Sequence, residues 1–177
     1  MPSTLPAVGL YAEQKRLSQA TLARWRSWPT TDQQALLTVA QELRLGENHL
    51  RDFLDWLEEI VLRDGGSIAA VLQQPAVRRA LKLGRSRNDK LKAVKDALRR
   101  LRYPEIARLE HELQTCVKAL ALGPQVRVAF PPAFEGDEVT LEVRVKSAKD
   151  LDAVVSRIRQ RLTDGTFQRL FELLDEA

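Results

Sequence analysis

The sequence contains few of the side chains from which catalytic and metal sites are usually built. Among its 177 residues are a single cysteine, Cys116, and two histidines, His49 and His111. One cysteine excludes an internal disulfide framework, and three such residues far apart offer no metal-ligand spacing. A Gly-rich phosphate loop and a convincing Ser/His/Asp set are also missing. We therefore predict no metal, no cofactor and no enzymatic activity.

Long hydrophobic runs are missing as well. The longest apolar stretches are far shorter than the roughly 20 residues that span a bilayer. Residues 1–10 lack the basic region and apolar core of a signal peptide, and we interpret them as a loose or docked arm. With 44% hydrophobic and 29% charged residues, the chain can bury a core and stay in solution. These features predict a cytoplasmic protein that does not contact a membrane.

Apolar residues recur at helical spacing up to about residue 122. The clearest stripe lies between residues 47 and 63, with apolar side chains at Leu50, Phe53, Leu54, Leu57, Ile60 and Val61. Proline, glycine and serine residues punctuate this pattern at the places where helices end and begin. We expect helices at about 18–28, 31–43, 47–63, two short ones between 67 and 83, then 88–102 and 104–122.

The period then changes from helical to two. Val126, Val128 and Phe130 alternate with polar or small residues, and a second alternating run covers 139–145. This pattern predicts two half-buried strands paired as a hairpin, followed by helices at 148–163 and 165–175. The fold class is thus α+β and mostly α. We expect a helical domain at 1–84, a basic helix pair at 85–122 and a ββα module at 123–177.

The strongest functional signal is a concentration of positive charge. Residues 78–102 hold 11 of the 28 Lys and Arg residues but only two acids, Asp89 and Asp96, so this segment is about +9 in a chain of net charge +4. Lys92, Lys95, Arg99 and Arg102 recur at helical spacing beside the apolar stripe and would form a ridge. The predicted nucleic-acid-binding residues are Arg85, Arg87, Lys90, Lys92, Lys95, Arg99, Arg100 and Arg102.

The same ridge has other interpretations. It could dock an acidic protein partner, which would make the chain an adaptor or regulator. It could also be a solvated helix face, or a surface that docks the acidic helix of this same chain. We favour a small, dimeric, non-enzymatic protein that binds nucleic acid, with DNA as the expected form, over these alternatives.

Residues 40–50 resemble a helix-turn-helix motif in their hydrophobic spacing. Five acids oppose a single arginine, Arg51, between residues 47 and 59 of the supposed recognition helix. Acids on a helix inserted in a DNA groove repel phosphates. We therefore interpret this degenerate helix-turn-helix-like segment as a helix pair that packs through Leu45, Leu50 and Phe53. If it binds anything, a basic protein surface is favoured over DNA.

Two further groups of residues invite a functional interpretation. Trp25, Trp28 and Trp56 could stack on bases, but aromatic residues at helical spacing are more often part of a core. Asp137, Glu142 and Arg144 resemble the acids and cation of metal-dependent nucleases. The alternation of an amphipathic strand already explains Glu142 and Arg144, so we favour the structural interpretation for both groups.

The stretch from Tyr103 to Leu162 resembles the C-terminal dimerisation module of ParB-like chromosome-partitioning proteins. The resemblance is carried by residues 106–113, then 126–128 and 139–143, and finally the Ser-capped segment 147–154 with its Leu-Asp pair. It implies an order of helix, strand, strand and helix, pairing of two chains, and nonspecific association with DNA. The Gly-Glu-Arg-Arg box of that family is missing, so nucleotide hydrolysis and sequence-specific binding are not implied.

The hairpin also predicts a homodimer on physical grounds. A two-stranded sheet is marginal alone, and its edges can pair with another strand. The apolar residues of the second strand, Val139, Leu141, Val143 and Val145, are the predicted dimerisation residues. We expect the helix at 148–162 to cover one face of the hairpin within the chain.

Overall fold

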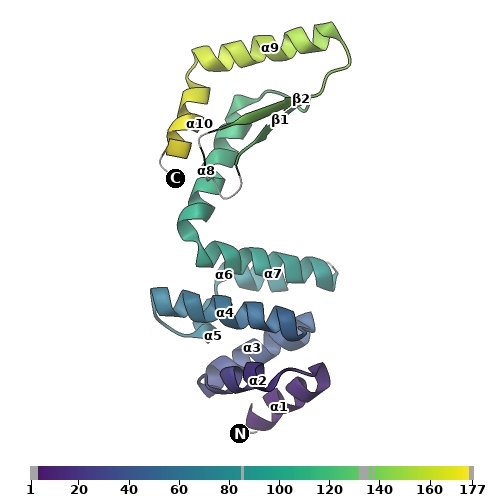
Figure 1. The fold of residues 1–177 in the computed structure, drawn as a ribbon, viewed down its shortest axis with the longest axis vertical. Coiled ribbons are helices and arrows are strands. Elements are labelled where there is room, and N and C mark those ends of the chain that lie inside the picture. Colours follow the sequence, from purple (N-terminus) through teal and green to yellow (C-terminus); the bar gives the residue numbers. More distant parts are fainter. Residues whose placement is uncertain (1–3, 85, 132–135, 137, 176–177) are drawn as a thin grey trace. The chain divides into compact units, whose positions relative to one another are not determined.

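The computed structural model describes residues 4–84, 86–131, 136 and 138–175 of the chain, and it confirms a mostly helical α+β protein (Figure 1). The chain divides into two compact units, unit 1 (Met1–Tyr103) and unit 2 (Pro104–Ala177). Among the described helices, none has the length and apolar character needed to cross a membrane. Each unit has its own hydrophobic core.

Unit 1 consists of helices. They are α1 (Thr4–Lys15), α2 (Gln19–Arg26), α3 (Thr30–Leu43), α4 (Glu47–Asp64), α5 (Ile68–Leu72), α6 (Pro75–Leu81) and α7 (Arg87–Arg102). Ser18, Ser67 and Ser86 cap α2, α5 and α7, because each hydroxyl accepts a hydrogen bond from a backbone N–H of the first turn. The arm predicted at residues 1–10 is helical from Thr4 onward.

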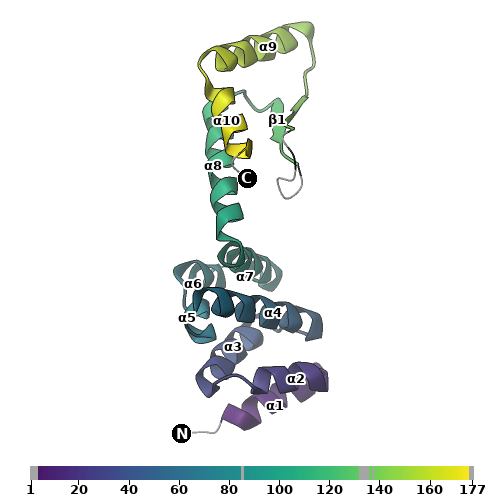
Figure 2. The ribbon, with the colours of Figure 1, turned by 60° about the vertical axis from the view of Figure 1, so that its left-hand side comes forward.

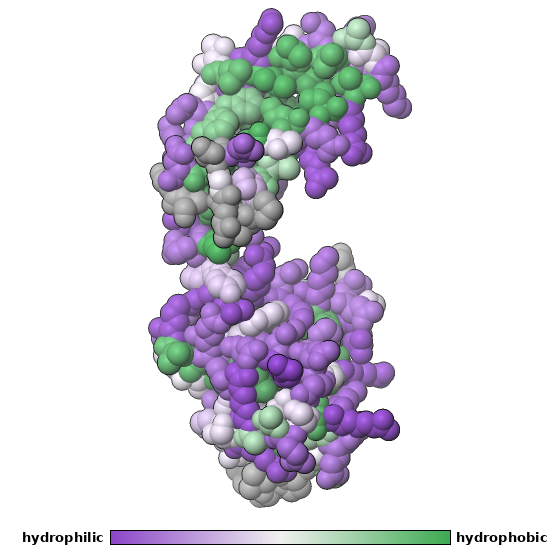
Figure 3. All heavy atoms as spheres, viewed as in Figure 1, coloured by the Kyte–Doolittle hydropathy of each residue, from purple (hydrophilic) through white to green (hydrophobic). Residues whose placement is uncertain are grey.

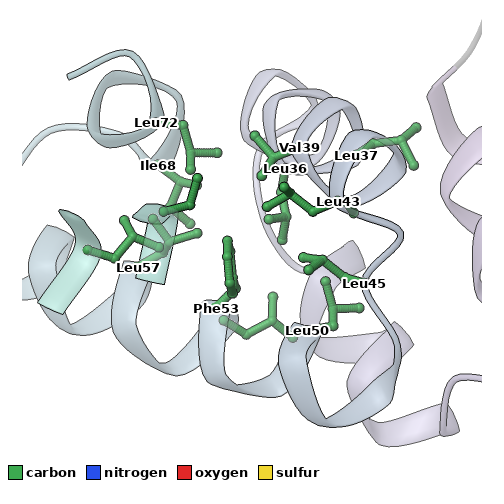
Figure 4. Packing of buried hydrophobic residues seen from close by; sticks show 14 of the residues in the cluster. Leu36, Leu37, Val39, Leu43, Leu45, Leu50, Phe53, Leu57, Ile68 and Leu72 are labelled. Atoms are coloured by element: carbon green, nitrogen blue, oxygen red, sulfur yellow. The ribbon is translucent and has the colours of Figure 1, made fainter. Parts of the chain in front are cut away.

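The core of unit 1 is built on the apolar face of α4. Figure 4 shows Leu50, Phe53 and Leu57 pointing from this helix toward side chains of α3 and toward Ile68 and Leu72. The stripe predicted from the sequence is therefore the buried face, and Leu45, Leu50 and Phe53 pack as expected for a helix pair. Burial of this face supplies the main driving force for folding of unit 1.

Two buried polar side chains, Tyr11 and Asp32, fix the helices around this core. The Tyr11 hydroxyl lies 2.8 Å from the carbonyl oxygens of both Ala40 and Leu45, so it ties α1 to the end of α3. Burial raises the pKa of Tyr11 to about 12, although its hydrogen bond to the Leu45 carbonyl works in the opposite direction. Buried Asp32 accepts a hydrogen bond from the backbone N–H of Ala69 at the start of α5. Trp25 is fully buried and meets the Tyr11 ring edge-on, as expected for a core residue.

Unit 2 combines two packed helices with a hairpin and a third helix. Its elements are α8 (Pro104–Leu120), β1 (Val126–Ala129), β2 (Thr140–Val143), α9 (Ala148–Thr163) and α10 (Thr166–Asp175). The strands are antiparallel, with Val126 opposite Val143 and Val128 opposite Leu141. Figure 2 shows α10 lying along α8, and their buried leucines with Phe167 form the core of the unit. This arrangement confirms the predicted hairpin and the last pair of helices.

The boundary between the units falls inside the predicted basic helix pair. Tyr103 follows α7 in a non-helical conformation, and Pro104 is the first residue of α8. A residue before proline is pushed away from the helical region, whereas proline itself suits a first helical position. The two helices predicted at 85–122 therefore belong to different units, and the basic one belongs to unit 1.

We predict that Phe53→Ala lowers the free energy of unfolding of unit 1 by about 3–5 kcal/mol, because it leaves a cavity in a fully buried site. Leu62→Ala on the same helix is the matched control, since Leu62 is 88% exposed, and it should change stability by less than about 0.5 kcal/mol. Chemical denaturation checks both values. Equal effects of the two variants would show that the apolar face of α4 is not the core.

Candidate nucleic-acid interface and dimerisation surface

The predicted nucleic-acid-binding residues lie on or beside α7. Arg85 lies outside the described residues, and the other seven are on the helix itself. Their environments differ because the helix is buried along Leu91, Val94 and Leu98. Some of the cations flank this buried face, whereas others point to solvent. The structure thus separates a set that the sequence pattern groups together.

Lys95 and Arg102 form an ion-pair seam with α4. Lys95 Nζ lies 2.7 Å from Asp52 Oδ2, and the Arg102 guanidinium lies 2.6 Å from Glu59 Oε2. Both steps, from Asp52 to Glu59 and from Lys95 to Arg102, are seven residues, so α4 and α7 run in the same direction. The pKa of Arg102 is raised, chiefly by its hydrogen bond to Glu59. These two cations of the ridge are therefore used to join two helices of the same chain.

Other contacts strengthen the packing of α7. The Arg63 guanidinium, near the end of α4, donates to the carbonyl oxygens of Leu101 and Arg102 at the end of α7. Such carbonyls have no partner inside their own helix, so a cation there is favourable. Lys95 also lies 5.3 Å from the ring centroid of Trp56, and Lys90 pairs with Glu42 of α3 at 2.9 Å. Trp56 thus contributes to the seam.

The opposite flank of α4 is held by α2. The Arg24 guanidinium pairs with Asp55 and Glu58, and Trp28 Nε1 donates to Glu58 Oε1 at 2.7 Å. Both acids raise the pKa of Arg24, with the hydrogen bond to Glu58 as the largest cause. The backbone N–H and hydroxyl of Ser18 and the hydroxyl of Thr21 donate to Glu47. All five acids of α4 between residues 47 and 59 are therefore engaged within the chain.

These contacts bear on whether the acids of the helix-turn-helix-like segment would repel DNA. The acids that would repel phosphates do not form a free negative face, because each has a hydrogen-bonding donor or a cation beside it. Their role in the structure is to hold α2 and α7 against α4.

A second set of cations is exposed and unpaired. Within the described part of the chain, no hydrogen bond or ion pair engages the side chains of Arg78, Arg79, Lys82, Lys92 and Arg100. The first three lie on α6 or at its C-terminal cap, α6 contains no acid, and it packs on α7. Among the described residues, the Arg87 guanidinium hydrogen-bonds to the side chain of the neighbouring Asn88. These residues leave α6 and the solvent side of α7 cationic.

The net charges of the two units have opposite signs. Residues 1–103 contain 18 Lys and Arg against 11 Asp and Glu, a net charge of +7. Residues 104–177 contain 10 and 13, a net charge of −3. The total of +4 hides this separation, so any attraction for a polyanion is concentrated on unit 1.

Unit 1 also has a groove of about 850 Å³ beside the end of α4. Its walls include Trp28, Val61 and the strongly exposed Leu62, together with Arg24 and Arg102. Of the carboxylates that line it, Asp55, Glu58 and Glu59 pair with these two arginines, and Asp32 accepts a hydrogen bond from the Ala69 N–H. The groove is therefore apolar with a rim of satisfied charges.

The four predicted dimerisation residues are all partly buried, and two of them pack against the core of unit 2. Val139 and Leu141 pack against the buried cluster of α8 and α10, and Val143 and Val145 are partly buried. The apolar residues that the sequence predicts as one stripe of α9, namely Leu151, Val154, Val155, Ile158 and Leu162, are buried only in part, at Val154 and Ile158. Leu151 is 46% exposed, Val155 37% and Leu162 60%, whereas Ile158 packs against the core. Figure 3 shows apolar side chains gathered over α9 and the hairpin.

A different flank attaches α9 to its unit. Val154 is fully buried, the Arg157 guanidinium donates to the Leu122 carbonyl at 2.8 Å, and Arg161 donates to the Leu120 carbonyl at 2.9 Å. Arg161 thus satisfies the carbonyl of the last residue of α8, where helix termini need donors, and Arg157 satisfies a carbonyl just after the helix. Sequence periodicity identifies an apolar stripe, but it cannot show which flank of α9 contacts the rest of the unit.

The residues considered for a nuclease site do not form one among those described. Asp137 lies outside the described residues, and Arg144 pairs with Glu142 at 2.6 Å on the surface. The described residues contain no group of His, Cys, Asp and Glu side chains able to hold a metal ion. Glu142 and Arg144 thus have the structural role that strand alternation predicts.

No protein-family model, curated protein or solved structure matches this chain. The ParB-like resemblance therefore stays a prediction. The order of helix, two strands and Ser-capped helix that it implies is present in unit 2.

Glu47 should make the stability of unit 1 depend on pH. Burial opposes its ionisation, but hydrogen bonds from Thr21 and Ser18 outweigh this and lower its pKa below 4.5. A lowered folded-state pKa stabilises the fold above the ordinary carboxyl pKa, and this stabilisation is lost as the pH falls through the folded value. We expect the stability gap between the wild type and Glu47→Gln to shrink between about pH 6 and pH 3. Denaturation at several pH values measures it, with Asn48→Ala as an uncharged control whose gap stays constant; a constant gap for Glu47→Gln would contradict the assignment.

The ion-pair seam predicts a charge-swap result. Lys95→Glu should lower the free energy of unfolding by on the order of 1 kcal/mol, because it places two carboxylates together, and Asp52→Lys in addition should recover most of the loss. Lys92→Glu makes the same charge change three residues away, where no described residue pairs with the lysine, and should cost less than about 0.5 kcal/mol. Equal losses for Lys92→Glu and Lys95→Glu would argue against a specific seam.

Proposed function

We propose that this chain is a non-enzymatic, dimeric nucleic-acid-binding protein of the cytoplasm, with DNA as the expected ligand. Unit 1 contacts the phosphates, and unit 2 pairs two copies. The observation that carries the proposal is the unequal use of charge in unit 1. The acids of α4 are engaged by donors of the same chain, whereas Arg78, Arg79, Lys82, Lys92 and Arg100 have no ion-pair partner among the described residues.

This inequality matters because paired charges cancel locally. An exposed ion pair contributes little field beyond its own neighbourhood, so the remaining cations dominate the potential of the surface. Each cation that neutralises a phosphate releases a condensed counterion, which makes binding favourable and dependent on salt. Asp96 lies between Lys92 and Arg100 along α7 and reduces this field, but α6 and its cap add three cations without an acid.

The proposed contact residues therefore differ from the ridge predicted from the sequence. Lys95 and Arg102 are committed to Asp52 and Glu59, and a phosphate would have to displace those carboxylates. Lys90 is likewise paired with Glu42. The exposed cations of α6 and the solvent side of α7 need no such exchange, so they are the better candidates for phosphate contacts.

Pairing of two copies through unit 2 rests on its exposed apolar surface. Large apolar side chains on α9 remain accessible, and apolar residues gather over α9 and the hairpin (Figure 3). Exposed apolar patches of this kind mark sites of association. A dimer also agrees with what the ParB-like resemblance implies for this module.

We predict that a variant with Arg78, Arg79, Lys82 and Lys92 all changed to Gln loses most of its affinity for double-stranded DNA of mixed sequence. The slope of log affinity against log salt should fall in magnitude by about 0.9 for each phosphate that the variant no longer neutralises. The fold should survive, because these side chains are exposed and unpaired within the described residues. Fluorescence anisotropy with a labelled duplex, measured at several salt concentrations, gives both quantities.

A matched control separates local from total charge. Lys118, Arg127, Lys146 and Lys149 are exposed cations of unit 2, and changing all four to Gln removes the same net charge. This control should bind DNA nearly as well as the wild type. The proposal fails if the two variants lose affinity equally, or if the wild type does not bind DNA.

The groove beside Leu62 favours one alternative function, that of a protein adaptor. An apolar groove of about 850 Å³ with an exposed leucine could hold an apolar side chain of a partner. An acidic partner could also contact the cations of α7, as considered from the sequence. Wild-type protein that binds no mixed-sequence DNA, but has a protein partner released by Leu62→Asp, would support the adaptor.

A further inference from the structure

We infer that α9 is the dimer contact and that it pairs in antiparallel orientation with α9 of a second copy. This inference deepens the proposed function, because it rests on the dimer and names the surface that forms it. Its basis is the row of Leu151, Val155, Ile158 and Leu162, called here the α9 stripe, together with two unpaired charges beside it.

The spacing of the α9 stripe suits pairing with itself. Its residues are separated by four, three and four positions, so the spacing is the same when the helix is followed in reverse. In an antiparallel pair centred between Val155 and Ile158, each leucine faces the other leucine position of the second copy. Val155 likewise faces Ile158 of that copy. A partner of unrelated sequence would have no reason to require this symmetry, whereas a twofold homodimer has a self-complementary interface.

Two charged residues on one flank of the stripe give the pairing a direction. Asp152 and Arg159 are seven residues apart, so they lie on the same side of the helix, and each directly follows a residue of the stripe. Both are exposed, and within the described part of the chain neither side chain makes a hydrogen bond or ion pair. They are therefore available to a second copy.

An antiparallel pair brings these charges together with opposite signs. Measured from the centre of the stripe, Asp152 lies 4.5 residues toward one end and Arg159 lies 2.5 residues toward the other. At 1.5 Å per residue, Asp152 of one copy and Arg159 of the other differ by only about 3 Å along the helix axis. The twofold symmetry forms this pair twice. In a parallel pair the twofold axis would run along the helices and put this flank of the two copies on opposite sides of the interface, so Asp152 and Arg159 would have no partner across it.

The rest of unit 2 leaves Leu151, Val155 and Leu162 of the stripe accessible, whereas Ile158 also packs against the core of its own unit. Val154, Arg157 and Arg161 lie on the opposite flank and attach α9 to the end of α8, and Arg161 also pairs with Asp164. Apolar side chains of the hairpin continue the surface beside α9 (Figure 3). A second copy could therefore cover both without disturbing the contacts that hold α9 in its own unit.

A charge swap in the full-length chain tests the inference. In Asp152→Arg both interface pairs become repulsive, so the dimer Kd from sedimentation equilibrium should rise roughly tenfold or more. Arg159→Asp should behave alike, and the double variant should return to within about threefold of the wild type, because the pairs are restored with exchanged signs. Leu162→Ser should also raise Kd, with unchanged circular dichroism showing that the chain stays folded.

Lys149→Glu is the control, because Lys149 is exposed on α9 away from the stripe, and its Kd should match that of the wild type. A dimer insensitive to both single charge variants and to Leu162→Ser, or a double variant without recovery, would overturn the pairing through α9 but not the dimer. A monomeric wild type at high micromolar concentration would overturn both. DNA binding, measured separately, distinguishes either result from failure of the nucleic-acid proposal.

Discussion

The structure of unit 1 depends on a conflict within α4 that its neighbours resolve. One side of this helix is apolar and fully buried, while the other carries a row of carboxylates that must stay beside the core. Arg24 on one flank and Lys95 and Arg102 on the other satisfy these carboxylates. Partly exposed ion pairs contribute little free energy individually, so burial of the apolar side provides the stability. The pairs instead set which residues of α2 and α7 face α4.

The ion-pair seam shows why charge in a sequence is a poor guide to charge on a surface. Residues 78–102 carry the strongest positive charge in the chain, yet part of it is used to bind acids some 40 residues earlier. One interpretation left open by the sequence was that the basic segment docks on the acidic helix of the same chain. Lys95 and Arg102 are used in this way. The free positive charge is displaced to α6 and the solvent side of α7, which shifts the proposed phosphate contacts without removing them.

Local features of the fold were predictable because local spacing encodes them. The α4 stripe, the serine caps and the alternation of Val126 and Val128 each depend on residues close together in sequence. Contacts between distant segments were not predictable in this way. Periodicity could not show that Lys95 meets Asp52, that residues from Thr4 begin a helix, or that Leu151 and Leu162 stay exposed. For the same reason, the sequence pattern placed all the predicted cations in one candidate site. It could not separate those that pair with acids of the same chain from those that stay unpaired.

The separation of the two hydrophobic clusters at Tyr103 and Pro104 has a thermodynamic consequence. Because the two units have separate hydrophobic cores, they can unfold in distinct cooperative transitions. One transition temperature then does not describe the whole chain. If unit 2 associates through its exposed apolar surface, mass action adds to its stability but not to that of unit 1. Dilution would then lower the midpoint of the unit 2 transition and leave that of unit 1 unchanged. The unit 1 transition would thus serve as a reference, within the same chain, against which dissociation of the dimer can be measured.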